Sequence, residues 1–207
     1  MKPSLELQNI LKTQKIALLV IDMQKDFIDE DGKLAQCGQD VSAMGLTVTP
    51  INKLIEKAHQ KKIPVIFTKM IDALKYRSEV GIYRFQQKEK VEENICVLEN
   101  TSGSEFSKIL PQEQDSVVIK HSYDSFNGTE LKSLLDEKEI KVLIITGVKT
   151  NVCVETTVRN AYHLGYYVIV PQECVASDDL AAHQQTLKNF QRYFADVIEL
   201  KDILEIL

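Results

Sequence analysis

Short apolar segments rich in β-branched residues alternate along the chain with longer amphipathic segments. Their apolar residues are nearly continuous rather than alternating with polar ones, which is typical of strands covered on both faces. The pattern predicts six strands, at residues 16–21, 64–68, 116–120, 141–146, 166–170 and 195–200. The intervening segments predict helices at residues 50–62, 128–138, 151–164 and 179–193.

This alternation predicts an α/β protein with a three-layer α/β/α, Rossmann-like fold and a central, mostly parallel six-stranded sheet. The 207 residues show no internal repeat, low-complexity tract or linker, so we expect a single domain over residues 1–207. Residues 70–105 depart from the pattern, because they carry many charged residues and only one short apolar cluster. We expect a long excursion there that helps to shape a binding site.

Composition narrows the functional classes. Hydrophobic residues make up 44% of the chain and the formal net charge is −5, which is ordinary for a globular protein and argues against a nucleic-acid partner. The apolar segment at residues 16–21 is too short to span a membrane, so we expect no membrane partner and a cytoplasmic location. The four cysteines are widely spaced, which favours free thiols over a disulfide framework.

Three reactive side chains fall where ligands of open α/β sheets bind, beyond the carboxyl ends of the strands. Asp22 follows the first strand, Lys120 ends the third, and Cys153 lies where a helix begins after the fourth. Taken singly, they read as a turn residue, a solvated charge and a packing residue. Together, an ammonium and a helix N-terminus favour a thiolate, and a carboxylate can take and return the thiol proton. Backbone N–H groups of the helix can stabilise an oxyanion, so the set predicts acyl transfer at an amide-like carbonyl.

Three blocks of sequence resemble the isochorismatase-like cysteine hydrolases. This family includes nicotinamidases, N-carbamoylsarcosine amidases, ureidoacrylate and biuret hydrolases, and isochorismatase. The blocks are ALLVIDMQKDF at 17–27, VIKHSYDSFNGTEL at 118–131 and ITGVKTNVCVETTVRNAYHLGYYVIVPQECVAS at 145–177. By position, the resemblance implies a catalytic triad: Asp22 as general acid and base, Lys120 as its electrostatic partner, and Cys153 as nucleophile.

The resemblance also implies a reaction. The Cys153 thiolate attacks a carboxamide or ureido carbonyl of a small-molecule substrate, and Asp22 protonates the departing ammonia or amine. Water then hydrolyses the thioester with Asp22 as base. A cis peptide bond between Val148 and Lys149 is implied, with an oxyanion hole formed by the backbone N–H groups of Lys149 and Cys153.

Substrate contacts are less defined. The candidates within the matching blocks are Gln24, Phe27, Tyr123 and Phe126. We expect at least one of the aromatic residues to pack in the core instead, since aromatic residues dominate cores as well as pockets. Gln24 has two further readings, as a residue that orients Asp22 and as a solvent-facing residue.

The sequence departs from one branch of the family. Nicotinamidases of the family bind a metal through an Asp-x-His pair and a later His, whereas the matching stretch here holds Asp72 and no His. Two imidazoles are hard to replace in such a site, so we predict no metal and no other cofactor. A cysteine at position 153 favours the amidase branch, because isochorismatase cleaves a vinyl ether without needing a thiol.

Four alternatives stay open beside the amidase reading. They are a nicotinamidase-type hydrolase, an isochorismatase-type hydrolase, a non-catalytic binding member of the same fold, and a redox protein that uses Cys153 with Cys174. Members of the family often form dimers or tetramers, so we also expect a homo-oligomer.

Overall fold

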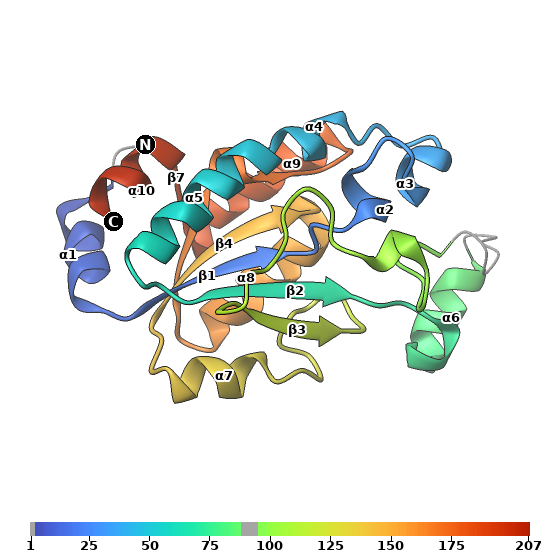
Figure 1. The fold of residues 1–207 in the computed structure, drawn as a ribbon, viewed down its shortest axis with the longest axis horizontal. Coiled ribbons are helices and arrows are strands. Elements are labelled where there is room, and N and C mark those ends of the chain that lie inside the picture. The colour runs from blue at the N-terminus through green and yellow to red at the C-terminus, as the bar shows by residue number, and fades with distance from the viewer. Residues whose placement is uncertain (1–2, 88–94) are drawn as a thin grey trace.

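A twisted parallel sheet forms the centre of the molecule, in a computed structural model that describes residues 3–87 and 95–207 (Figure 1). The sheet has seven strands in the order β3-β2-β1-β4-β5-β7, with β6 paired to the end of β4, and every pair is parallel. The strands are β1 (Ile16–Ile21), β2 (Val65–Met70), β3 (Ser116–Lys120), β4 (Val142–Val148), β5 (Tyr167–Pro171), β6 (Val175–Ala176) and β7 (Asp196–Ile198).

Helices cover both faces of the sheet and complete the three layers. The cluster on one face contains buried residues of α1, α5 and α10, and the cluster on the other contains residues of α7, α8 and α9. The longer helices are α1 (Leu5–Thr13), α5 (Val48–Gln60), α6 (Glu79–Gln86), α7 (Leu131–Glu137), α8 (Glu155–His163), α9 (Leu180–Asn189) and α10 (Leu200–Ile206). Short helices α2 (Lys25–Ile28), α3 (Lys33–Gln36) and α4 (Ser42–Leu46) follow β1.

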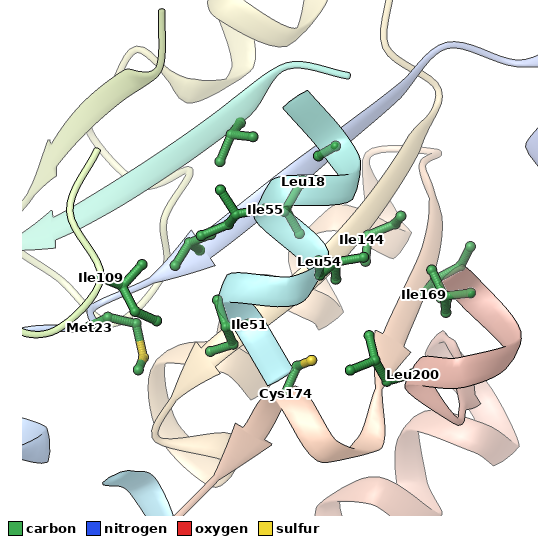
Figure 2. Packing of buried hydrophobic residues seen from close by; sticks show 14 of the residues in the cluster. Leu18, Met23, Ile51, Leu54, Ile55, Ile109, Ile144, Ile169, Cys174 and Leu200 are labelled. Carbon is green, nitrogen blue, oxygen red and sulfur yellow. The ribbon is translucent and has the colours of Figure 1, made fainter. Parts of the chain in front are cut away.

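The alternation of side chains along β1 divides the core. Leu18 and Val20 belong to the cluster under α5, while Leu19 and Ile21 belong to the cluster on the opposite face. Figure 2 shows the first cluster, in which Ile51, Leu54 and Ile55 of α5 lie over Leu18 of β1 and Ile144 of β4. All six residues of β1 are buried, which explains its uninterrupted apolar sequence.

All six predicted strands are present, and the fold class is confirmed. The seventh strand, β6, is only two residues long and leaves no pattern in the sequence. Helices α1 and α10 were not predicted, and α10 begins at Leu200, where we expected the last strand to end. The helix predicted from residue 151 begins instead with a π-helical turn, Thr150–Val154, that continues into α8.

In its described part, the excursion at residues 70–105 contains the end of β2, the 3₁₀ turns Leu74–Tyr76 and Ser102–Ser104, and helix α6. Residues 88–94 of the excursion lie outside the described residues. In the described part of the chain, no helix combines the length and the apolar character that a membrane crossing requires.

Candidate active site

The site lies where the direction of the strand connections reverses. From β1 the chain passes through α5 to β2 on one side, whereas β4 lies on the other side of β1 and is reached through α7. Such a reversal leaves a crevice beyond the carboxyl ends of the two central strands. Asp22 directly follows β1 and Cys153 lies five residues beyond β4, so both fall at this point.

Asp22 adopts an unusual backbone conformation at the end of β1. Its φ of 52° lies in the left-handed region, which Asp tolerates better than most residues. The Asp22 N–H donates to the carbonyl of Thr68 on β2, and the Asp22 carbonyl accepts from the Gln24 N–H at 2.8 Å. The chain therefore turns at Asp22 while it remains attached to β2.

Gly147 lets β4 approach the same point. Its φ is 111°, and a Cβ atom there would lie 2.0 Å from the carbonyl oxygen of Ile21. Because no larger residue fits, a glycine near the end of β4 is required for the close pairing of Ile21 with Gly147. This pairing brings the turn that carries Cys153 next to Asp22.

A buried ion pair joins Asp22, which follows β1, to Lys120, which ends β3. The Lys120 Nζ lies 2.8 Å from Asp22 Oδ2, and both side chains are fully buried. Lys120 also donates to the carbonyl oxygens of Ser122, at 3.1 Å, and Tyr123, at 3.0 Å. The Thr68 hydroxyl donates to Asp22 Oδ1 at 2.7 Å. These hydrogen bonds offset part of the cost of burying two charges.

The ammonium of Lys120 stays charged in this environment. Burial lowers the pKa of Lys120, but the attraction of the Asp22 carboxylate and of Cys153 outweighs it, so the pKa is raised above its ordinary value. Although Asp22 Oδ2 lies next to this ammonium, it accepts no well-directed hydrogen bond from the described residues. We therefore regard Oδ2 as the atom that can accept a further proton.

Cys153 lies within reach of both charges. It is 6% exposed in the π-helical turn, and its thiol interacts with Asp22 and Lys120. Burial raises the pKa of the Cys153 thiol to about 12; Lys120 lowers it and Asp22 raises it further. The thiolate that we expected from the sequence is thus disfavoured, because burial outweighs the nearby ammonium. In the resting site Cys153 is therefore a neutral thiol at pH 7.

The predicted pocket residues separate into two groups. Gln24 is fully buried, with its amide nitrogen donating to the carbonyls of Met70 and Ser104 and its oxygen accepting from the Met70 N–H. These bonds tie the end of β1 to β2, so Gln24 acts as a positioning residue and does not contact solvent. Phe27 packs against one core cluster, and Phe126 is buried in the other.

Tyr123 remains as the exposed aromatic candidate. It is 58% exposed, and its hydroxyl is close enough to Cys153 for the thiol to raise the pKa of Tyr123, although burial of the hydroxyl itself is the larger cause. Tyr123 is thus partly open to solvent and close enough to Cys153 to interact with it. This combination suits a side chain at the entrance to the site.

The expected cis peptide bond between Val148 and Lys149 is present. The Lys149 side chain forms an ion pair with Asp178, with 2.6 Å between Nζ and Oδ1. Cys174 packs in the core cluster on the opposite face of the sheet from Cys153. The redox pairing of these two cysteines is therefore not supported.

Thr68 is a site residue that the sequence analysis missed. It is the polar residue in the otherwise apolar segment PVIFT, and it pairs with Ile21, the residue before Asp22. The signal available in the sequence was a hydroxyl residue at the end of an otherwise apolar strand segment. The carbonyls of Ser122 and Tyr123 left no signal, because any residue can supply a backbone oxygen.

The described residues contain no cluster of three or more His, Cys, Asp or Glu side chains that could hold a metal ion. Asp72, the residue that matches a nicotinamidase ligand, instead accepts hydrogen bonds from two guanidinium nitrogens of Arg77, Nε and Nη2. His121, next to Lys120, is exposed and stacks on Tyr76 with 3.7 Å between the ring centroids. The absence of a metal stays a prediction for metal analysis.

Two surface hollows, of about 280 and 540 Å³, lie elsewhere, and neither is lined by Asp22, Lys120 or Cys153. The larger one is lined by Ile16 and Ile140, near the amino ends of the strands and at the opposite edge of the sheet. Cys153 itself is 6% exposed, so little of the residue is open to solvent.

The sequence as a whole matches a known family. A family model described as "Isochorismatase domain" matches residues 16–202. The chain belongs to the isochorismatase family. Members that resemble it include the ureidoacrylate amidohydrolase RutB of Pseudomonas savastanoi pv. phaseolicola, which is 29% identical over 205 residues. That alignment covers 93% of this chain and 83% of the relative.

Solved structures of the isochorismatase family share the fold. The cysteine hydrolase from Pseudomonas syringae pv. phaseolicola 1448A superposes with a TM-score of 0.81 at 25% identity, over 93% of this chain and 92% of that one. The N-carbamoylsarcosine amidase from Thermoplasma acidophilum superposes with a TM-score of 0.73 at 25% identity, over 90% and 96% of the two chains. At the level of the family, these relatives support hydrolysis of a ureido or amide C–N bond.

Proposed function

We propose that the chain is a cysteine amidohydrolase that cleaves the C–N bond of a small ureido or carboxamide substrate through a thioester on Cys153. The observation that carries this proposal is the fully buried pair of Asp22 and Lys120 in contact with the Cys153 thiol. The chain is similar to a ureidoacrylate amidohydrolase, and this similarity favours a ureido substrate over a carboxamide.

The first half-reaction begins from the neutral thiol. Asp22 accepts the thiol proton as Cys153 Sγ attacks the carbonyl carbon, which forms the C–S bond and places a negative charge on the carbonyl oxygen. The backbone N–H groups of Lys149 and Cys153 donate to this oxyanion. When the tetrahedral intermediate collapses, the C–N bond breaks, and Asp22 gives its proton to the departing nitrogen. Ammonia or an amine leaves, and the acyl or carbamoyl group stays on Cys153.

The second half-reaction reverses the roles. A water molecule attacks the thioester carbonyl while Asp22 takes one of its protons. The C–S bond then breaks, and the proton on Asp22 returns to the sulfur as Cys153 leaves as a thiol. The product is a carboxylic acid from a carboxamide, or a carbamic acid from a ureide. Each cycle consumes one water and restores both Asp22 and Cys153 to their starting protonation states.

Lys120 holds Asp22 in place as the base. Its ammonium lies 2.8 Å from Asp22 Oδ2, while the Thr68 hydroxyl donates to the other carboxylate oxygen. Lys120 therefore acts through Asp22 rather than on the substrate.

The proposal is tested by ammonia release from ureidoacrylate, N-carbamoylsarcosine, biuret and nicotinamide. We expect turnover of at least one ureide by the native protein and loss of that turnover in Cys153→Ala. Cys37→Ala is the matched control, since Cys37 is an exposed free thiol outside the site. No turnover of any compound, or equal turnover by Cys153→Ala, would overturn the proposal and favour a non-catalytic member of the fold. Turnover of nicotinamide alone would instead indicate the nicotinamidase alternative.

A further inference from the structure

The turn that carries Cys153 is held from outside the site by a second segment. We call residues 149–155 the nucleophile turn and residues 177–186 the latch segment. All four polar side chains of the nucleophile turn bind side chains of the latch segment. The contacts are Lys149 with Asp178 at 2.6 Å, Thr150 with His183 at 2.9 Å, Asn151 with Ser177 at 2.6 Å, and Glu155 with Thr186 at 3.0 Å.

The side-chain contacts begin directly beyond the point where the backbone pairing of the sheet ends. The pairing of β4 with β6 ends at Val148 and Ala176, one residue before each segment begins. Thr150 is fully buried, and Ser177 and Thr186 are each 4% exposed, so three of the four contacts have one partner that is shielded from water. Breaking such a contact is costly, because the shielded group loses its partner without gaining solvent.

The backbone of the nucleophile turn departs from regular α-helical geometry. The Lys149 carbonyl accepts both the Val152 N–H, at 3.1 Å, and the Val154 N–H, at 3.2 Å, which makes a wide turn rather than a regular α-helical one. Oxyanion stabilisation requires donors at about 2.7–3.1 Å from the developing charge. The contacts with the latch segment add side-chain constraints to the backbone that carries these N–H groups.

We propose that the latch segment fixes the geometry of the nucleophile turn and that His183 is its central positioning residue. The proposal rests on the proposed function, because it assigns a catalytic consequence to the geometry of Cys153. His183 binds Thr150, which lies between Lys149 and the rest of the turn. It projects from the first turns of α9, three residues before Thr186, so the two side chains share one face of that helix.

His183→Leu removes the hydrogen bond to Thr150 and keeps an apolar side chain of similar reach, whereas His183→Asn keeps a polar atom near the position of Nδ1. Thr150→Val removes the same hydrogen bond from the other side. His163→Leu is the matched control, because His163 is an exposed histidine of α8 outside the latch segment.

We measure kcat and KM with ureidoacrylate. For His183→Leu and for Thr150→Val we expect kcat to fall about tenfold with KM changed by less than about twofold, since a small misplacement of reacting groups affects the transition state more than binding. The double variant should fall no further than the larger single effect, and His183→Asn should recover most of kcat. Native kcat in His183→Leu, additive losses in the double variant, or an Asn variant no better than Leu would overturn the proposal.

Hydrogen–deuterium exchange separates this proposal from the proposed function, because it needs no substrate. In His183→Leu we expect faster exchange in peptides that cover residues 149–155, and native exchange in β1 and β2. Unchanged exchange in residues 149–155 would overturn the latch even if the protein hydrolyses a ureide. If the native protein hydrolyses none of the compounds, the proposed function fails, and the exchange experiment still decides whether the latch holds the turn.

Discussion

Replacement of Lys120 by Met tests the buried ion pair. Methionine has a similar length and no charge, so Lys120→Met leaves the Asp22 carboxylate buried without its partner 2.8 Å away. Removing one member of a fully buried pair costs about 3–5 kcal/mol of folding free energy. For a chain of 207 residues, this corresponds to a fall of roughly 6–20 °C in Tm.

The pH dependence of this loss has a defined sign. Burial lowers the pKa of Lys120, but the attraction of Asp22 and Cys153 outweighs it, so the folded pKa lies above the unfolded one. The stabilising contribution is then fully present below the unfolded value of about 10.4 and is lost as the pH rises through the folded value. The difference in unfolding free energy between the native protein and Lys120→Met should therefore shrink as the pH rises above about pH 10.5.

Urea denaturation followed by circular dichroism measures this difference at each pH. Lys132→Met is the matched control, because Lys132 forms a solvent-exposed pair with Asp136, four residues along α7, and exposed pairs contribute little to stability. The double variant Asp22→Asn/Lys120→Met should regain much of the stability, since no charge stays buried. If Lys120→Met loses no more than the control, or if its loss grows above about pH 10.5, the buried pair does not act as described.

Four further predictions follow from the site. Because burial raises the pKa of Cys153 to about 12, its rate of reaction with iodoacetamide should rise about tenfold per pH unit between about pH 7 and 10. Mass spectrometry measures the labelling, and a rate that reaches a plateau below about pH 8 would contradict the raised pKa. Thr68→Val removes a hydrogen bond to a charged group worth about 1.5–3 kcal/mol, so kcat should fall about 10- to 150-fold while Thr68→Ser stays near native; native kcat in Thr68→Val would refute the role of the hydroxyl. Metal analysis of the purified protein should find no transition metal at a stoichiometric level, and one ion per chain would refute the metal-free site. We propose a dimer or tetramer that covers exposed apolar side chains such as Val80 and Tyr83 of α6, and a monomer in light scattering at micromolar concentration would contradict it.

The strands were predictable because burial on both faces demands continuous apolar sequence. Every residue of β1 and β4 is buried, so both segments stand out in the sequence. Strand β6 has two residues, and two residues carry no period. Helix α1 has an amphipathic sequence but buries only Leu7 and Leu11, so it resembles many exposed segments.

The site was predictable where strand ends fix position. Asp22, Lys120 and Cys153 could be placed at one edge because parallel strands share the direction of their carboxyl ends. Protonation could not be predicted, since the pKa of Cys153 depends on burial that only packing determines. Gln24 could not be assigned either, because its buried hydrogen bonds to Met70 and Ser104 join segments far apart in the sequence.

The contacts of the latch segment could not be predicted from the sequence either. Its contacts with the nucleophile turn join residues about 30 positions apart, such as Thr150 and His183, and none of the pairs has a characteristic spacing. His183 reads from the sequence as an ordinary helical residue. Only the packing of α9 against the nucleophile turn reveals what it binds.

Detection of the acyl-enzyme tests the thioester mechanism most directly. The native protein is mixed with a ureide that it turns over, quenched in acid within milliseconds, and mapped by mass spectrometry. We predict the mass of the carbamoyl or acyl group on the peptide that contains Cys153, formed no slower than turnover, removed by hydroxylamine and absent from Cys153→Ala. Turnover with the adduct on another residue, or continued turnover in Cys153→Ala, would contradict the mechanism.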